Sequence, residues 1–199
     1  MIRAFVGIKR RFPVLWNCVE WINGQLFKLR CRKLPQMATS ILEDVSVAGC
    51  RFSLMEKNDM PALAELIGRQ EPEYLVWFGP HPFDRKTLER LYRNPSFLMM
   101  KVTETEDRMI GYFFLRCFVI GRAFAGLLVD KTWQNQGIGS AIWAACAAIC
   151  RSAGLRMQAT ISADNKASVA SCRKGTDTQQ IAMLKDNFMA VECRPKPGI

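Results

Sequence analysis

The segment of this sequence with the clearest capacity for chemistry is a pair of glycines at the start of a helix. Gly137 and Gly139 stand between an apolar run that ends at Val129 and an Ala-rich stretch. The first amides of a helix have no partner within the helix, and the helix dipole favours negative charge there. Because glycine has no side chain, a phosphate group can approach this backbone closely. The segment predicts an anion site, although two glycines before a helix more often form a tight turn.

A second group of reactive side chains lies in the loop at residues 70–84, QEPEYLVWFGPHPFD. Its titratable residues include Glu71, Glu73 and His81. An imidazole can take a proton from an ammonium group near neutral pH. The alternative, that His81 merely shapes a loop between two prolines, stays open. The same loop could wall an acceptor pocket, or cover the core, with its aromatic residues Tyr74, Trp77 and Phe78.

The apolar patterns predict the elements that position these groups. Strands are expected at residues 51–54, 97–102, 109–118, 123–129, 157–161, 179–184 and 188–193. Helices are expected at residues 14–29, 85–93, 137–151 and 165–174, with a further one that ends at Ile67. The glycine pair therefore lies in a passage from a strand into a helix.

These motifs resemble those of the GNAT superfamily of N-acetyltransferases, which use acetyl-coenzyme A. The spacing Gln134-x-x-Gly137-x-Gly139 is similar to the cofactor signature of that family, and Asn165-x-x-Ser168 is similar to the start of its second motif. The resemblance covers residues from about 50 to 193. It implies an α/β (α+β) GNAT fold, with a mixed, mostly antiparallel sheet of about seven strands flanked by about four helices.

The resemblance also implies roles for individual residues. Backbone and hydroxyl donors to the coenzyme A pyrophosphate would come from Gln136, Gly137, Ile138, Gly139 and Ser140, with Gln134 nearby. Main-chain groups of Leu127 and Val129 would pair with the pantetheine arm as an added strand does. Asn165 and Ser168 would flank that arm from the other side.

Two departures from the family pattern concern proton transfer. Cys172 stands where many members place a tyrosine that protonates the departing thiolate; it is either an acid or a buried structural thiol. The expected strand 123–129 carries no carboxylate, so the general base is unassigned, with His81 and Glu73 as candidates.

The activity implied is transfer of an acetyl group from acetyl-coenzyme A to a primary amine of a small molecule, such as an amino sugar or sugar nucleotide. The transfer would proceed by direct attack in a ternary complex. The alternatives are a non-catalytic, coenzyme A-binding sensor or scaffold, and an acetyltransferase that acts on protein N-termini or lysines.

The first 45 residues form an expected N-terminal unit, and residues 46–199 the acetyltransferase domain. Residues 1–42 hold eight Lys or Arg against a single acid, Glu20. Apolar residues recur at helical spacing from Leu15 to Leu29, and residues from Pro35 to about Asp44 are expected to be a linker. Such an amphipathic helix could lie on a membrane surface, form a homodimer, or pack on its own domain.

Composition excludes several other classes of function. The eight cysteines form no CxxC pair and there is one histidine, so no metal site is expected. Free thiols in apolar surroundings are typical of the reducing cytoplasm, with a peripheral position at the inner face of a membrane left open. No nucleic-acid partner is expected, because no stacking platform or binding motif accompanies the basic arm.

Overall fold

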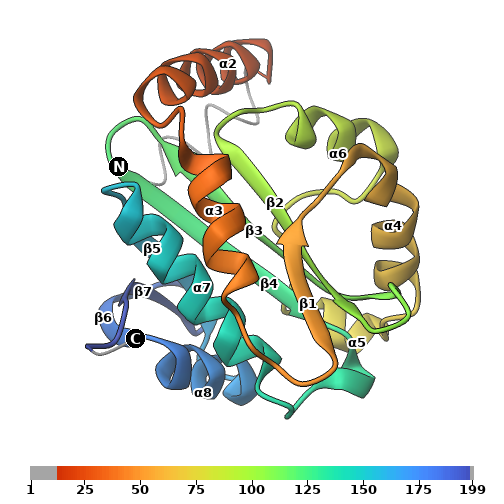
Figure 1. The fold of residues 1–199 in the computed structure, drawn as a ribbon. Coiled ribbons are helices and arrows are strands. Elements are labelled where there is room, and N and C mark those ends of the chain that lie inside the picture. Colours follow the sequence, from red (N-terminus) through yellow and green to blue (C-terminus); the bar gives the residue numbers. More distant parts are fainter. Residues whose placement is uncertain (1–12, 198–199) are drawn as a thin grey trace.

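The structure, a computed structural model, describes residues 13–197, with side chains from residue 18 on. Its centre is a seven-stranded sheet in the order β1-β2-β3-β4-β5-β7-β6 (Figure 1). Neighbouring strands are antiparallel except for β4 and β5, which are parallel. The strands are β1 (Cys50–Leu54), β2 (Phe97–Glu104), β3 (Met109–Phe118), β4 (Arg122–Val129), β5 (Arg156–Ser162), β6 (Asp177–Met183) and β7 (Phe188–Arg194).

Helices cover both faces of the sheet. The helices are α2 (Pro13–Arg30), α3 (Leu34–Glu43), α4 (Met60–Gly68), α5 (Pro72–Leu75), α6 (Arg85–Tyr92), α7 (Ile138–Ser152) and α8 (Lys166–Gly175). Short 3-10 turns lie at Lys57–Asp59 and Lys131–Trp133. One core packs α3 and α7 on the sheet, and the other packs α4 and α6 on its opposite face. Within residues 13–197, no helix is long and apolar enough to cross a membrane.

The predicted fold class is confirmed, and each predicted strand and helix is present within a few residues of its expected bounds. The segment expected to be a linker is instead the helix α3. Pro35 stands in its first turn, where a missing amide hydrogen costs little. Leu34, Ala38 and Leu42 recur every four residues and are buried in the core. The division into residues 1–45 and 46–199 stays a prediction.

The helix α2 lies over the turn between β3 and β4 and turns its apolar stripe outward. Val19, Ile22, Leu26 and Leu29 are all exposed. Phe27, on the opposite side of the helix, is buried in the core. Leu15 belongs to the predicted stripe but lies outside the residues whose side chains are described.

Candidate functional site

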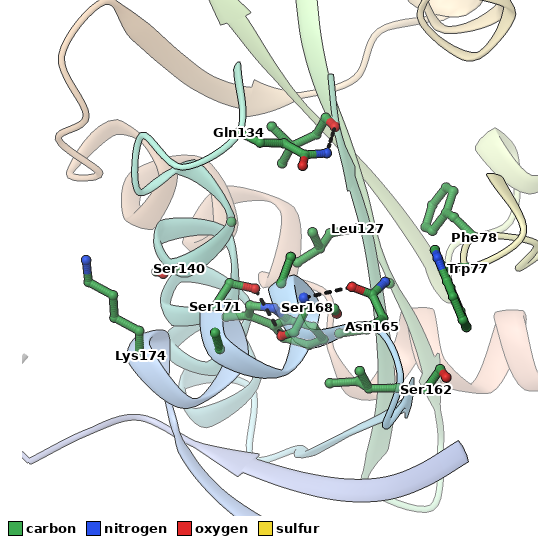
Figure 2. A pocket seen from close by; sticks show the side chains of 18 of the residues that line it. Trp77, Phe78, Leu127, Gln134, Ser140, Ser162, Asn165, Ser168, Ser171 and Lys174 are labelled. Carbon is green, nitrogen blue, oxygen red and sulfur yellow. Dashed lines mark hydrogen bonds between the residues drawn. The ribbon is translucent and has the colours of Figure 1, made fainter. Parts of the chain in front are cut away.

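A cleft opens where β4 and β5 separate. The two parallel strands pair only from Arg122 with Arg156 to Phe124 with Gln158, although β4 continues to Val129 and β5 to Ser162. The cavity between the diverging ends has a volume of about 360 Å³. Its wall comes from β4, β5, the start of α7, one side of α8, and α5 with the loop that follows it (Figure 2). The sheet is thus interrupted by a gap that an extended molecule could fill.

Main-chain groups of β4 face this gap at alternate residues. The amide of Asp130 donates to the carbonyl of Ile110 in β3 at 2.8 Å, and Leu128 pairs with β3 in the same register. Since consecutive residues of a strand direct their main-chain groups to opposite sides, those of Leu127 and Val129 are directed toward β5. The carbonyl of Val129 accepts from Tyr74 Oη at 2.9 Å. The remaining groups present the edge on which an added strand can pair.

The passage from β4 into α7 closes one end of the cleft. Gly137 precedes the helix with φ of +85°, a conformation that glycine adopts without strain. Gly139 and Ser140 follow in the first turn and line the cavity. Because α7 has 15 residues, its free first-turn amides carry a full helix dipole toward an anion at this end. The local structure fits the predicted pyrophosphate site.

The helix α8 packs beside the start of α7 and forms a polar wall. Asn165 Oδ1 accepts from the amide of Ser168 at 2.9 Å and caps the helix. Ser171 Oγ donates to the carbonyl of Ser168 at 3.0 Å. Lys174, one turn further, also lines the cavity and adds a positive charge beside the polar side chains. Figure 2 shows Ser140, Ser171 and Lys174 away from Trp77 and Phe78, which lie across the strands of the cleft.

The aromatic wall comes from α5 and the loop that follows it. Tyr74, Trp77 and Phe78 line the cavity, and Tyr74 and Phe78 also pack against the core, so both interpretations of these aromatic residues hold in part. Burial raises the pKa of Tyr74 above its ordinary value, and its hydrogen bonds to Val129 and Gln134 only partly oppose that effect. Tyr74 is therefore a neutral phenol at physiological pH.

Polar contacts to the buried carboxylate of Asp130 stabilise the loop between β4 and α7, residues 130–137, which we call the signature loop. Arg69 Nε donates to Asp130 Oδ2 at 2.9 Å, and Thr132 donates its amide and hydroxyl to the other carboxylate oxygen. Burial of Asp130 opposes its ionisation, but the hydrogen bonds from Arg69 and Thr132 outweigh it and hold its pKa below the ordinary value. A carboxylate so paired is a poor base, and its role is to position the loop.

The structure brings most of the predicted cofactor residues together. Eight of them line the cleft, namely Leu127, Val129, Gln134, Gly137, Gly139, Ser140, Asn165 and Ser168. Ile138 is buried in the core, so only its backbone can serve a ligand. Gln136 is exposed and is not among the lining residues.

The three candidate catalytic residues lie outside the cleft lining. His81 has Nε2 at 3.1 Å from Tyr112 Oη and Nδ1 at 2.9 Å from the carbonyl of Pro82, with its ring packed among aromatic rings. Glu73 is exposed on α5. Cys172 is buried on the far side of α8, and its sulfur lies 3.5 Å from that of Cys193. Their catalytic roles stay predictions.

The thiols of Cys172 and Cys193 shift each other's pKa in opposite directions. The hydrogen bond with Cys193 lowers the pKa of Cys172, against the effect of burial, and the pKa of Cys193 is raised. Thr178 Oγ1 is also 3.5 Å from the Cys172 sulfur. The thiol is thus directed to β6 and β7 rather than to the gap beside β4.

Sequence reasoning missed several lining residues. Ser171 lies three residues after Ser168 and three before Lys174, so helical spacing could have placed it on the same face. Ser162, at the end of β5, carried no such signal. Arg69 could not be linked to Asp130, because 61 residues separate the two partners.

Comparisons with known proteins agree with this architecture. A family model described as the acetyltransferase (GNAT) family matches residues 61–175. No curated protein sequence matches the chain.

Among solved structures, RimL, a ribosomal L7/L12 alpha-N-protein acetyltransferase, is 19% identical with a TM-score of 0.63, over 76% of this chain and 92% of its own. A spermidine N-acetyltransferase from Vibrio cholerae, in complex with CoA and spermine, is 13% identical with a TM-score of 0.58, over 73% and 94%. An aminoglycoside acetyltransferase in complex with coenzyme A and kanamycin is 14% identical with a TM-score of 0.58, over 74% and 95%. At such identities these likenesses show the fold alone.

Proposed function

The chain belongs to the acetyltransferase (GNAT) family, and from that premise we propose that it transfers the acetyl group of acetyl-coenzyme A to a primary amine of a small molecule. The observation that carries the proposal is the gap between β4 and β5, closed at one end by the start of α7. A strand edge beside a helix start suits a ligand with an extended amide arm and a pyrophosphate.

Different residues of the cleft would contact different parts of coenzyme A. The pyrophosphate would meet the amides around Gly137 and Gly139 and the hydroxyl of Ser140, with Lys174 nearby. The pantetheine arm would pair with the edge at Leu127 and Val129. Asn165 and Ser168 would flank that arm from α8.

The reaction we propose is a direct attack. The amine nitrogen bonds to the thioester carbonyl carbon, the carbon–sulfur bond breaks, and the thiolate of coenzyme A departs and gains a proton. Main-chain amides of Leu127 and Val129 would hold the thioester and stabilise the developing oxyanion.

The amine must lose a proton to react. Among the described residues that line the cleft there is no histidine, aspartate or glutamate, and burial keeps Tyr74 as a neutral phenol. We therefore assign the deprotonation of the ammonium group to solvent. His81 and Glu73 remain the side chains to test against this assignment.

The acceptor would lie against the aromatic wall. Tyr74, Trp77 and Phe78 offer flat apolar faces next to the strand edge that would hold the thioester. Such faces suit a sugar ring or a nucleotide base, and a cationic amine is attracted to them as well. An amino sugar or sugar nucleotide is the acceptor that we propose, in the cytoplasm, where the eight cysteines would stay reduced.

The second candidate is a coenzyme A-binding module without catalysis. It is favoured by Cys172, which stands where many members have a tyrosine and whose sulfur is directed away from the cleft. Acceptors on proteins are a further alternative within the same chemistry.

One experiment distinguishes these functions. The full-length protein is incubated with acetyl-coenzyme A and separate panels of amino sugars, amino-sugar nucleotides, polyamines and peptides. Because the chain carries eight thiols of its own, acetylated product is followed by mass spectrometry in addition to thiol release. Saturable acetylation of a small amine supports the proposal. Turnover with peptides alone would show that the acceptor is a protein and not a small molecule. Tight coenzyme A binding without turnover on any panel would identify the non-catalytic module.

A further inference from the structure

The outward face of α2 is an apolar surface that the acetyl-transfer proposal does not use. Val19, Ile22, Leu26 and Leu29 recur every three or four residues along it, and Trp21 flanks them. Trp21 is 65% exposed and Leu29 is 70% exposed. A contiguous apolar stripe exposed to water is energetically unfavourable and marks an interaction site.

Polar contacts fix this orientation of the helix. Asn23 Nδ2 donates to Ser96 Oγ and to the carbonyl of Cys117, each at 3.0 Å, and Asn23 Oδ1 accepts from the amide of Val119 at 3.0 Å. Turning the apolar stripe inward would remove all three hydrogen bonds and leave part-buried polar groups unpaired. The outward stripe is therefore built into the packing of α2.

Charge distinguishes the two faces further. Glu20 is the only acid among residues 1–42, and it is turned inward, where it pairs with Arg116. Lys28 in the last turn of α2 and Arg32 and Lys33 just after the helix are all exposed. Four more basic residues precede the helix in the sequence, Arg3, Lys9, Arg10 and Arg11. The outward surface thus combines an apolar stripe with positive charge.

A neighbouring turn extends the surface. Arg30 donates to the carbonyl of Val119, which places the end of α2 beside the turn between β3 and β4. Ile120, in this turn, is 73% exposed. Figure 1 shows α2 at the top of the molecule, with the loop between β3 and β4 beneath it.

We propose that this face of α2 docks on an anionic phospholipid membrane. An apolar stripe flanked by Lys and Arg is the pattern of helices that lie in the headgroup region, and tryptophan favours that boundary. A second copy of the chain is a poorer occupant, because a symmetric contact between two such faces would bring their basic residues together.

Docking in this way leaves the cleft accessible. The turn at Val119 and Ile120 is at the start of β4, whereas Val129 is at its far end. A strand of this length spans roughly 20–25 Å, so the site of acetyl transfer would stand away from the lipid surface. Membrane binding and catalysis are thus separable by mutation.

Vesicle flotation of the full-length protein tests the proposal. Binding is expected to vesicles of phosphatidylcholine with phosphatidylserine and not to phosphatidylcholine alone, and it should weaken as salt is raised. Lys28→Gln with Lys33→Gln should lower the partition coefficient roughly thirtyfold, given the usual contribution of a basic residue at an anionic surface. Leu26→Glu with Leu29→Glu should abolish binding.

Two control variants test whether the loss of membrane binding is specific to the changes in and beside α2. Ile181→Glu with Met183→Glu removes two apolar residues of β6, each 52% exposed, and adds the same charge; Lys57→Gln with Lys185→Gln removes two exposed charges elsewhere. Both controls should float as the unmodified protein does. Equal flotation with neutral vesicles, no flotation at all, or a Leu29-dependent dimer in place of lipid binding would each overturn the proposal.

Discussion

Replacing Gly175 with alanine tests how the two walls of the cleft are held together. A Cβ at this position would lie 2.2 Å from the carbonyl oxygen of Ser140 and 2.9 Å from Cβ of Trp143. A carbon and a carbonyl oxygen in close contact are usually about 3.3 Å apart. The added atom must therefore push α8 away from α7 by roughly 1 Å, because neither neighbour is the end of a flexible side chain.

The displacement has two measurable consequences. Overpacking of this kind lowers the free energy of unfolding by about 1–3 kcal/mol. It also shifts Asn165 and Ser168 of α8 relative to Ser140 of α7, so coenzyme A should bind at least about tenfold more weakly, in line with the effect of such shifts on positioned groups. Urea denaturation measures the first effect and isothermal titration calorimetry the second.

Gly68→Ala is the matched control. It lies at the end of α4, and no atom lies within 4 Å of the position that its Cβ would take. This change should be neutral or should stabilise the fold by up to about 1 kcal/mol. If Gly175→Ala were as stable as the unmodified protein and bound coenzyme A equally well, the account of α8 packing would be refuted.

Three further predictions concern proton transfer and the signature loop. His81→Gln and Glu73→Gln should retain most of the turnover, and the rate should rise with pH as the acceptor amine loses its proton. If either variant instead lost an inflection in the rate profile across pH 5.5–9.5, the replaced residue would be the base; removal of a general base typically lowers the rate about hundredfold or more. Cys172→Ala should keep turnover within a few-fold, since its sulfur is directed to Cys193, whereas a loss beyond roughly a hundredfold with intact cofactor binding would show that the thiol is the acid. The pKa of Asp130 is lowered from 3.8 in the folded state, so its contribution to stability is present above that pH and is lost as pH falls through the folded value. Asp130→Asn should therefore be less stable than the unmodified protein at neutral pH, with a difference that shrinks below pH 3.8 in urea denaturation, and a constant difference would contradict the assignment.

Much of the fold could be predicted from the sequence because its local signals agree with its packing. Strand alternation and helix spacing identify β2 to β7 and the helices α4, α6, α7 and α8. The helix α3 was missed because Pro35 and the polar residues Gln36, Thr39 and Ser40 suggested a linker. Its apolar residues Leu34 and Leu42 stabilise the helix by packing in the core, and that contact cannot be recognised from the local sequence.

The site likewise has a part that could be predicted from the sequence and a part that could not. The residues of the strand-to-helix passage could be placed in advance, because a backbone site depends on glycine spacing and strand register rather than on side-chain direction. The direction of Cys172 could not, because α8 has polar residues on its cleft face and a thiol on its buried one, and spacing does not say which face meets the cleft. Likewise the outward stripe of α2 follows from Asn23 and Glu20, whose partners are distant in sequence.

Calorimetric titration of coenzyme A into the unmodified protein and into Gly139→Trp shows whether the cofactor binds in the gap between β4 and β5. Gly139 lies in the first turn of α7, and even its Cβ would be 3.3 Å from Cβ of Ser171, so a tryptophan there must occupy the end of the cleft that would hold the pyrophosphate. We expect tight, saturable binding to the unmodified protein and little or none to the variant, with both proteins folded by circular dichroism. Equal affinity of the two proteins would contradict it, because the cofactor would then bind somewhere other than the gap between β4 and β5.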